Sequence, residues 1–163
     1  MREIKVAATQ MACSANTDEN VDKAIELITQ ASKEGANIIL IQELFGNVYF
    51  CKDQKDQYFD LAMPFDGHPI LNTMSKVAKE HNVVLPISYF EKSNKAYFNS
   101  VAIINADGSI LGNYRKSHIP VGPDTKKNFI SIQEILDSKS GIQVLQKLEL
   151  EFVGINGLLR QLE

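Results

Sequence analysis

The sequence predicts an α/β fold, in which strands and helices alternate along the chain. Two apolar runs of strand length, at residues 4–10 and 38–41, flank a segment whose apolar residues recur at helical spacing. A third apolar run, at residues 83–89, follows a second segment of helical spacing. Such strand–helix–strand units favour parallel strands joined by a right-handed crossover. The chain has 163 residues, 44% of them hydrophobic, which is enough to form one globular core.

The first helix has a recognisable start and stop. Residues 4–10 should form a buried strand, after which Asn16 offers an N-cap side chain, with Glu19 at the third helical position. Apolar residues between positions 21 and 31 form one stripe at helical spacing, which we interpret as core packing. Gly35 should end the helix, because glycine readily adopts the left-handed conformation common at helix C-termini.

The second strand should cover residues 38–41, a continuous apolar run typical of strands covered on both faces. Residues 45–65 have no clean period and many aromatic side chains. We expect a long connection there, of the kind that often lines a site. Pro69 should open a second helix, because proline suits the first helical turn. The core-facing residues of this helix are expected to be Leu71, Met74, Val77 and Ala78.

A third strand and a hairpin follow. Residues 83–89 read as a strand in which Pro86 indicates an edge position or a bulge, since proline has no N–H for the ladder. Residues 96–104 and 110–114 should pair as antiparallel strands, because the segment between them, residues 105–109, reads N-A-D-G-S and contains a strong turn sequence.

Composition excludes several classes of protein. Charged residues make up 23% of the chain and the net charge is −3, which argues against disorder and against nucleic acid as a partner. The N-terminus lacks the apolar core of a signal peptide, and no apolar stretch is long enough to span a membrane. Cys13 and Cys51 form no disulfide framework, so a cytoplasmic location is expected. We expect no metal and no cofactor, because there is no glycine-rich phosphate loop and the three histidines have no partner at metal-ligand spacing. These are His68, His81 and His118.

Two charged residues are candidates for catalysis. Glu43 directly follows the second predicted strand, where partial desolvation would raise its pKa toward the range of a general base; a solvated glutamate at a strand end is the simpler alternative. Lys116 is a candidate catalytic cation, although most lysines are surface groups. An unusual extended tract follows it, because Ile119 precedes a proline. We interpret His118 as structural, and Cys51 as a small buried hydrophobe rather than a nucleophile.

Several ordered segments resemble the nitrilase, or carbon–nitrogen hydrolase, superfamily. The broad resemblance lies in A-A-T-Q-M at residues 7–11, A-N-I-I-L-I-Q-E-L-F at 36–45 and Y-R-K-S-H-I-P at 114–120. A narrower resemblance, to the branch that hydrolyses carbamoylated amines, lies in Y-F-C at 49–51, L-P-I-S-Y-F-E-K at 85–92 and N-S-V-A at 99–102. Together these matches cover residues 1–123 nearly without gaps.

The resemblance implies a fold and a mechanism. The expected fold is the N-terminal half of a nitrilase-type α-β-β-α sandwich, and full-length relatives are expected to be homo-oligomers. The family uses a Glu–Lys–Cys triad, in which Glu43 would be the general base and Lys116 the cation that stabilises the oxyanion. The implied substrate is a small carbamoyl amine, attacked at its carbamoyl carbon by the cysteine thiolate. In such a triad, a positioned base activates the thiol and a fixed cation stabilises the developing negative charge.

After Pro123 the chain departs from the family pattern, which should continue roughly as G-Y-Q-E-K-F-Y-F-N-P-G-D and later include the nucleophile in I-C-W-D-Q-W. Synonymous codons for residues 128–137 can be chosen so that the neighbouring frame reads F-Y-F-N-P-G-D-T-G. The same frame of residues 152–157 can read I-C-W-D-Q-W. We therefore interpret residues 124–163 as an out-of-frame tail after the loss of one nucleotide. The alternative is a genuine helical tail.

Two functional expectations follow. On the frameshift interpretation the chain has no triad nucleophile and is inactive, and the half-sandwich leaves an apolar sheet face and edge exposed. The alternative is a non-catalytic domain that uses the half-sandwich and a helical tail for protein association.

Overall fold

The computed structural model describes residues 4–53 and 55–117. The predicted tail at 124–163, His118 and Ile119 lie outside these described residues. In chain order the elements are β1 (Val6–Ala8), α1 (Thr17–Lys33), β2 (Ile38–Leu40), the short 3-10 helices η1 (Phe50–Lys52) and η2 (Asp56–Leu61), α2 (Pro69–His81), β3 (Leu85–Ser93), β4 (Ala96–Ile104) and β5 (Ile110–Arg115). The predicted α/β class is confirmed.

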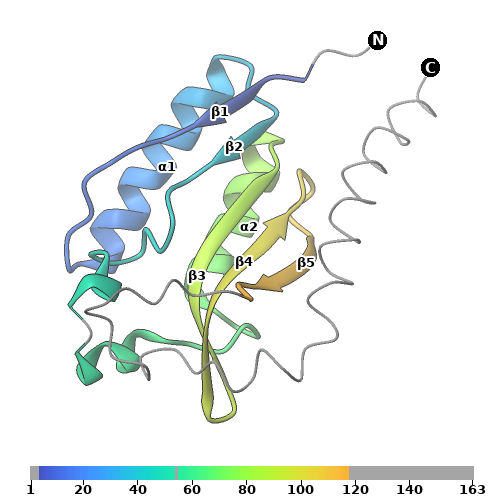
Figure 1. Cartoon of the computed structure of the whole chain (residues 1–163). Coiled ribbons are helices and arrows are strands. Elements are labelled where there is room, and N and C mark those ends of the chain that lie inside the picture. The colour runs from blue at the N-terminus through green and yellow to red at the C-terminus, as the bar shows by residue number, and fades with distance from the viewer. Residues whose placement is uncertain (1–3, 54, 118–163) are drawn as a thin grey trace.

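The described strands form a two-stranded sheet, β1-β2, and a three-stranded sheet, β3-β4-β5, which lie next to each other (Figure 1). β1 and β2 pair in parallel, as predicted, with Val6 opposite Ile38. A parallel bridge between Ile38 and Val84 joins β2 to the segment leading into β3. β3, β4 and β5 then pair antiparallel. The predicted hairpin is confirmed, and Gly108 adopts the positive φ of 86° within its turn.

The predicted edge position at Pro86 is confirmed. β3 is an edge strand of the three-stranded sheet β3-β4-β5, and Pro86 pairs with Ile103 in regular register, without a bulge. Across the bridge, the Ile39 N–H donates to the Val84 carbonyl at 3.0 Å. In a parallel ladder the next bond would come from the N–H of residue 86, which proline lacks. The proline therefore ends the β2–β3 ladder after one bridge.

The N-cap predicted at Asn16 is confirmed. Asn16 Oδ1 accepts from the backbone N–H groups of Asp18 at 3.0 Å and Glu19 at 3.4 Å. The Glu19 carboxylate accepts from the Asn16 side-chain amide at 3.1 Å and from the Ser14 hydroxyl at 2.9 Å. Gly35, with φ of 88°, follows the helix as expected. The cap thus satisfies donors that the helix itself cannot satisfy.

Replacing the cap should weaken the fold measurably. We expect Asn16→Ala to lower the free energy of unfolding by about 1 kcal/mol, because two backbone N–H groups lose their acceptor. Urea unfolding followed by circular dichroism measures the change. Asn72→Ala, on the exposed surface of α2, is the matched control and should change the unfolding free energy little. Equal stability of the two variants would contradict the assignment of the cap.

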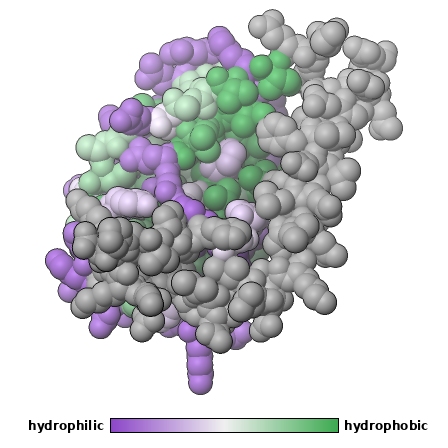
Figure 2. All heavy atoms as spheres, in the orientation of Figure 1, coloured by the Kyte–Doolittle hydropathy of each residue, from purple (hydrophilic) through white to green (hydrophobic). Residues whose placement is uncertain are grey.

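The helices α1 and α2 cover one face of the sheet, and the main core lies between them and that face (Figure 1). Ala7 of β1 and Ile39 of β2 point into this core, whereas their neighbours Val6 and Leu40 remain 65% and 50% exposed. The prediction that β1 is buried and β2 is covered on both faces is therefore wrong, since no second layer covers these positions in the described part of the chain. Figure 2 shows hydrophobic side chains gathered on the viewer's side of the molecule, and the expected apolar exposure is confirmed.

Candidate active site

The structure brings together the two charged residues singled out in the sequence. Lys116 Nζ lies 3.0 Å from Glu43 Oε1, although 73 positions separate the two residues in the chain. Glu43 follows β2, and Lys116 directly follows β5. Both side chains are partly exposed, at 42% and 37%, so the pair remains accessible to a small molecule. The fold thus assembles an acid–cation pair from the ends of two strands.

Asn99 of β4 links the two members of the pair. Its side-chain amide donates to Glu43 Oε1 at 2.6 Å, and its backbone carbonyl accepts from the Lys116 N–H at 2.8 Å. Asn99 is only 6% exposed, so its amide has a fixed setting. Asn99 lies in a segment that resembles the family, but its place in the sequence indicates no role, because local spacing does not reveal a partner 56 residues away.

The predicted raised pKa of Glu43 is wrong in direction. Burial acts to raise the pKa of Glu43, but the hydrogen bonds from Lys116 and Asn99 and the charge of Lys116 outweigh burial, and the pKa lies below its ordinary 4.5. The hydrogen bond to Glu43 raises the pKa of Lys116 against the opposing effect of burial. Both groups are therefore ionised at neutral pH, and the carboxylate is ready to accept a proton.

The connection predicted at 45–65 packs beside this pair. Phe50 and Ala62 contact Leu44 and Phe90 in a second apolar cluster. Further aromatic rings of the connection and the β3–β4 hairpin pack around the cluster; these are Tyr58, Phe59 and Tyr97. The aromatic residues that obscured any period in the sequence thus fix the connection against the hairpin.

Tyr49 and Cys51, at the start of this connection, lie within electrostatic reach of the Glu43–Lys116 pair, and their side chains hydrogen-bond each other. Burial, followed by the negative charge of Glu43, raises the pKa of the Cys51 thiol. Cys51 is therefore a neutral thiol at neutral pH, which is consistent with its interpretation as a small hydrophobic residue rather than a nucleophile. Cys13 lies elsewhere, where its sulfur accepts a hydrogen bond from the Gln42 side chain at 3.1 Å.

The remaining candidates do not extend the site. Burial lowers the pKa of His68 to about 4, and His81 contacts Thr29 and Ser32 on α1. Across residues 4–53 and 55–117, no group of three or more His, Cys, Asp or Glu side chains could hold a metal ion. No helix in the same part of the chain is long and apolar enough to cross a membrane.

Removing the Asn99 amide should change the titration of Glu43. We expect Asn99→Ala to raise the pKa of Glu43, because one of the donors that stabilise the carboxylate is lost. Because the pKa of Glu43 is lower in the folded chain than in the unfolded chain, the ionised carboxylate stabilises the fold at pH values above the unfolded-chain pKa. This stabilisation is lost as the pH falls through the pKa of the folded chain. The variant should therefore lose part of the stabilisation seen at neutral pH. Carbon-13 NMR of the Glu43 carboxyl measures the pKa, and Asn72→Ala is the control. An unchanged titration would exclude this role of Asn99.

A partly exposed acid–cation pair at the ends of strands, in an α/β sheet, suits hydrolysis of a small polar substrate. Residues 5–150 match the carbon-nitrogen hydrolase family, and the chain belongs to that family. The match continues past Pro123 into the predicted tail. The chain is 52% identical over 127 residues to N-carbamoylputrescine amidase of Oryza sativa subsp. japonica, covering 78% of this chain and 42% of the relative. It is 49% identical over 122 residues to citrullinase of Francisella tularensis subsp. tularensis, covering 75% and 43%.

Solved structures agree with the fold. A carbon-nitrogen hydrolase from Helicobacter pylori G27 aligns with a TM-score of 0.69 and 32% identity, over 78% of this chain and 43% of that chain. Nit3 of Saccharomyces cerevisiae, a nitrilase superfamily member, aligns with a TM-score of 0.62 and 23% identity, over 76% and 49%, and supports the fold alone. The predicted nitrilase-type fold is therefore confirmed for the part of the fold that this chain covers. The chain spans less than half the length of the curated relatives it matches.

Proposed function

We propose that this gene, with its reading frame restored after Pro123, encodes a carbon–nitrogen hydrolase of the N-carbamoylputrescine amidase type, and that the 163-residue chain lacks the nucleophile and is inactive. Such an enzyme converts N-carbamoylputrescine and water to putrescine, carbon dioxide and ammonia, a step that supplies the polyamine putrescine. The observation that carries the proposal is the 3.0 Å contact between Glu43 and Lys116. It lies in a chain with about half of its aligned residues identical to those of N-carbamoylputrescine amidases from plants.

In this proposal each member of the pair has one role. Glu43, a carboxylate at neutral pH, accepts the proton of the attacking thiol. Lys116 carries a fixed positive charge that stabilises the negative oxygen formed when sulfur adds to the carbamoyl carbon. The carbon–nitrogen bond then breaks, and the nitrogen leaves as an amine with the proton held by Glu43. Water hydrolyses the S-carbamoyl intermediate that remains, which regenerates the thiol and releases a carbamic acid. The carbamic acid splits into carbon dioxide and the second amine, so that putrescine and ammonia are both released.

The nucleophile of this reaction is not supplied by Cys13 or Cys51, the chain's two cysteines. We propose that residues 124–163 are translated out of frame and that the neighbouring frame encodes the nucleophile, near residues 152–157. Sequencing the gene across the codons for Pro123 and Asp124 tests this. A TGT triplet spanning the codons of Phe152 and Val153 is expected, and its absence would refute the frameshift.

The substrate is tested with the product of the frame-restored gene. N-Carbamoylputrescine and citrulline carry the same carbamoyl group but differ at the far end, where citrulline is an amino acid. We expect a higher kcat/KM for N-carbamoylputrescine, since the amidases named for it show 51–52% identity. A preference for citrulline would keep the reaction class and overturn the substrate.

The exposed sheet face favours a second candidate, a non-catalytic domain for protein association. Val6 and Leu40 present apolar surface that association could cover. A stable oligomer of the 163-residue chain, with no hydrolysis in either frame, would favour this candidate over the amidase.

A further inference from the structure

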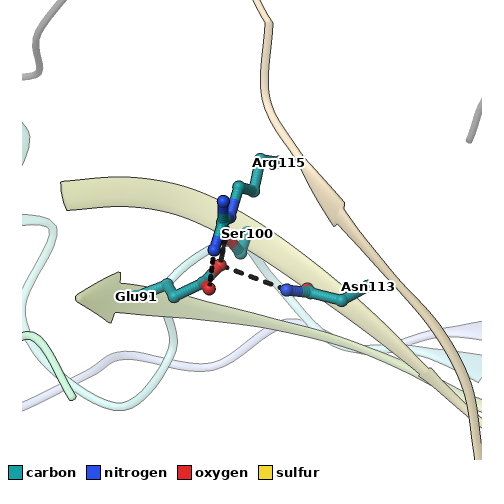
Figure 3. Close-up of polar contacts among 4 residues, drawn as sticks. All are labelled: Glu91, Ser100, Asn113 and Arg115. Atoms are coloured by element: carbon teal, nitrogen blue, oxygen red, sulfur yellow. Dashed lines mark hydrogen bonds and ion pairs between the residues drawn. The ribbon is translucent and has the colours of Figure 1, made fainter. Parts of the chain in front are cut away.

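A second carboxylate, this one buried, lies on β3, which pairs with the strand that carries Asn99. Glu91 of β3 is 2% exposed and accepts hydrogen bonds from three side chains (Figure 3). Arg115 donates through two nitrogens, from Nη2 to Oε1 at 2.6 Å and from Nε to Oε2 at 3.1 Å. Ser100 Oγ and Asn113 Nδ2 donate to Oε2 at 2.6 and 3.1 Å. The catalytic pair proposed above does not include this group.

Residues next to each other in the chain donate hydrogen bonds to the two carboxylates, Glu91 and Glu43. Ser100 and Arg115, which bind Glu91, stand opposite each other in the β4–β5 register. Asn99 and Lys116 directly adjoin them in the chain and bind Glu43. Because successive side chains of a strand point to opposite faces, Asn99 and Ser100 of β4 reach the two carboxylates from opposite sides of the sheet. Any shift of β5 along β4 would disturb both clusters together.

The Glu91 cluster holds the end of β5 in a defined place. The two nitrogens of Arg115 fix the plane of its guanidinium group, which also lies over the Phe98 ring at 4.2 Å from its centroid. The register of β4 and β5 is irregular at the opposite end of the pair, between Ile103 and Ile104. The regular pairing near Arg115 therefore sets where Lys116 begins.

Stability alone explains this ion pair poorly. Glu91 is buried but the Arg115 side chain is 43% exposed, so the desolvation cost of the carboxylate offsets much of the attraction between the two charges. Burial acts to raise the pKa of Glu91, but the donors from Arg115, Ser100 and Asn113 outweigh it and keep the carboxylate ionised. What the pair supplies in addition is a directional restraint on one end of β5.

We propose that Glu91 is a positioning residue, whose bidentate contact with Arg115 holds β5 in register so that Lys116 meets Glu43. The inference rests on the proposed role of the Glu43–Lys116 pair. Glu91 does not touch the substrate; it acts through Arg115 and the backbone that continues into Lys116.

The first test measures the Glu43–Lys116 contact without catalysis. Glu91→Gln is introduced into the full 163-residue chain, and the Glu43 carboxyl is titrated by carbon-13 NMR. We expect the pKa of Glu43 to rise, because a displaced Lys116 no longer stabilises the carboxylate. Ile28→Ala, on the buried face of α1 and outside both carboxylate clusters, should destabilise the fold and leave that pKa unchanged. A folded Glu91→Gln chain with the parental pKa would overturn the proposal.

A second variant decides the case if Glu91→Gln fails to fold. Arg115→Lys keeps the positive charge beside Glu91 but removes the planar two-nitrogen contact. The proposal expects the pKa of Glu43 to rise in this variant too. An unchanged pKa would show that charge neutralisation alone is needed and would reject the positioning role.

The third test uses the product of the frame-restored gene. Glu91→Gln should lower kcat by about 10²-fold with little change in KM, as expected when a catalytic group is displaced by about 1 Å. A rise in KM alone would contradict positioning of Lys116. The NMR result does not depend on hydrolysis. Absence of activity in the parent would thus refute the proposed function, whereas an unchanged pKa of Glu43 would refute this inference.

Discussion

Insertion of one nucleotide directly after the codon for Pro123 is expected to convert an inactive chain into an amidase. The 163-residue chain holds Glu43 and Lys116 in contact, but its only cysteines are Cys13 and Cys51, and burial raises the pKa of both thiols. Loss of the nucleophile in a covalent hydrolase costs about 10⁶-fold in kcat. Release of ammonia from N-carbamoylputrescine, measured for both gene products, should therefore differ by several orders of magnitude.

Two controls make this comparison decisive. Changing the restored cysteine codon to serine should abolish the gained activity, and it separates recovery of the nucleophile from recovery of the fold. Cys51→Ser should leave the restored activity nearly unchanged, since Cys51 is a neutral, partly buried thiol. Comparable ammonia release by the 163-residue chain itself would show that one of its own cysteines is the nucleophile.

In the frame-restored enzyme, we expect Glu43→Gln to lower kcat/KM by about 10³-fold, within the range for loss of a general base. Glutamine preserves the shape of the side chain but cannot accept the thiol proton. Because Lys116 and Asn99 hold the pKa of Glu43 below 4.5, Glu43 should remain ionised, and able to act as the base, as the pH falls to about 4.5. Kinetics of carbamoyl hydrolysis between pH 4 and pH 9 would measure both effects.

The matched control for this prediction is Glu80→Gln, on the exposed side of α2 far along the chain from the pair. It removes the same charge from the protein and should leave the rate unchanged. If Glu43→Gln retained the parental rate, Glu43 would not be the base, and its contact with Lys116 would be structural.

The local features of the fold could be predicted from the sequence. Asn16 and Gly35 mark the bounds of α1 through cap chemistry, and the turn near Gly108 marks the hairpin, because these depend on residues close in the chain. Layering could not be predicted in the same way. An apolar run such as Ile38–Leu40 shows that a strand belongs to a sheet, but it does not show whether both faces are covered.

The site could be predicted only in part. Glu43 and Lys116 were identified from their positions and from the family resemblance, and the structure places them in contact. The direction of the pKa of Glu43 was predicted wrongly, because it depends on donors 56 and 73 residues away. Glu91 was missed for a related reason. In the sequence it is one acidic residue near the end of a strand, and only the β4–β5 pairing supplies its three partners.

The proline that ends the β2–β3 ladder also determines where the acid can stand. Beyond the bridge at Val84, the chain after β2 separates from β3, and the Ser88 hydroxyl, rather than a backbone group, accepts the Leu44 N–H at 3.1 Å. A residue with an N–H in place of Pro86 would allow further backbone hydrogen bonds between β2 and β3. Those bonds would stabilise the sheet but would also restrict the segment that carries Glu43, so the gain in stability would lower catalytic activity.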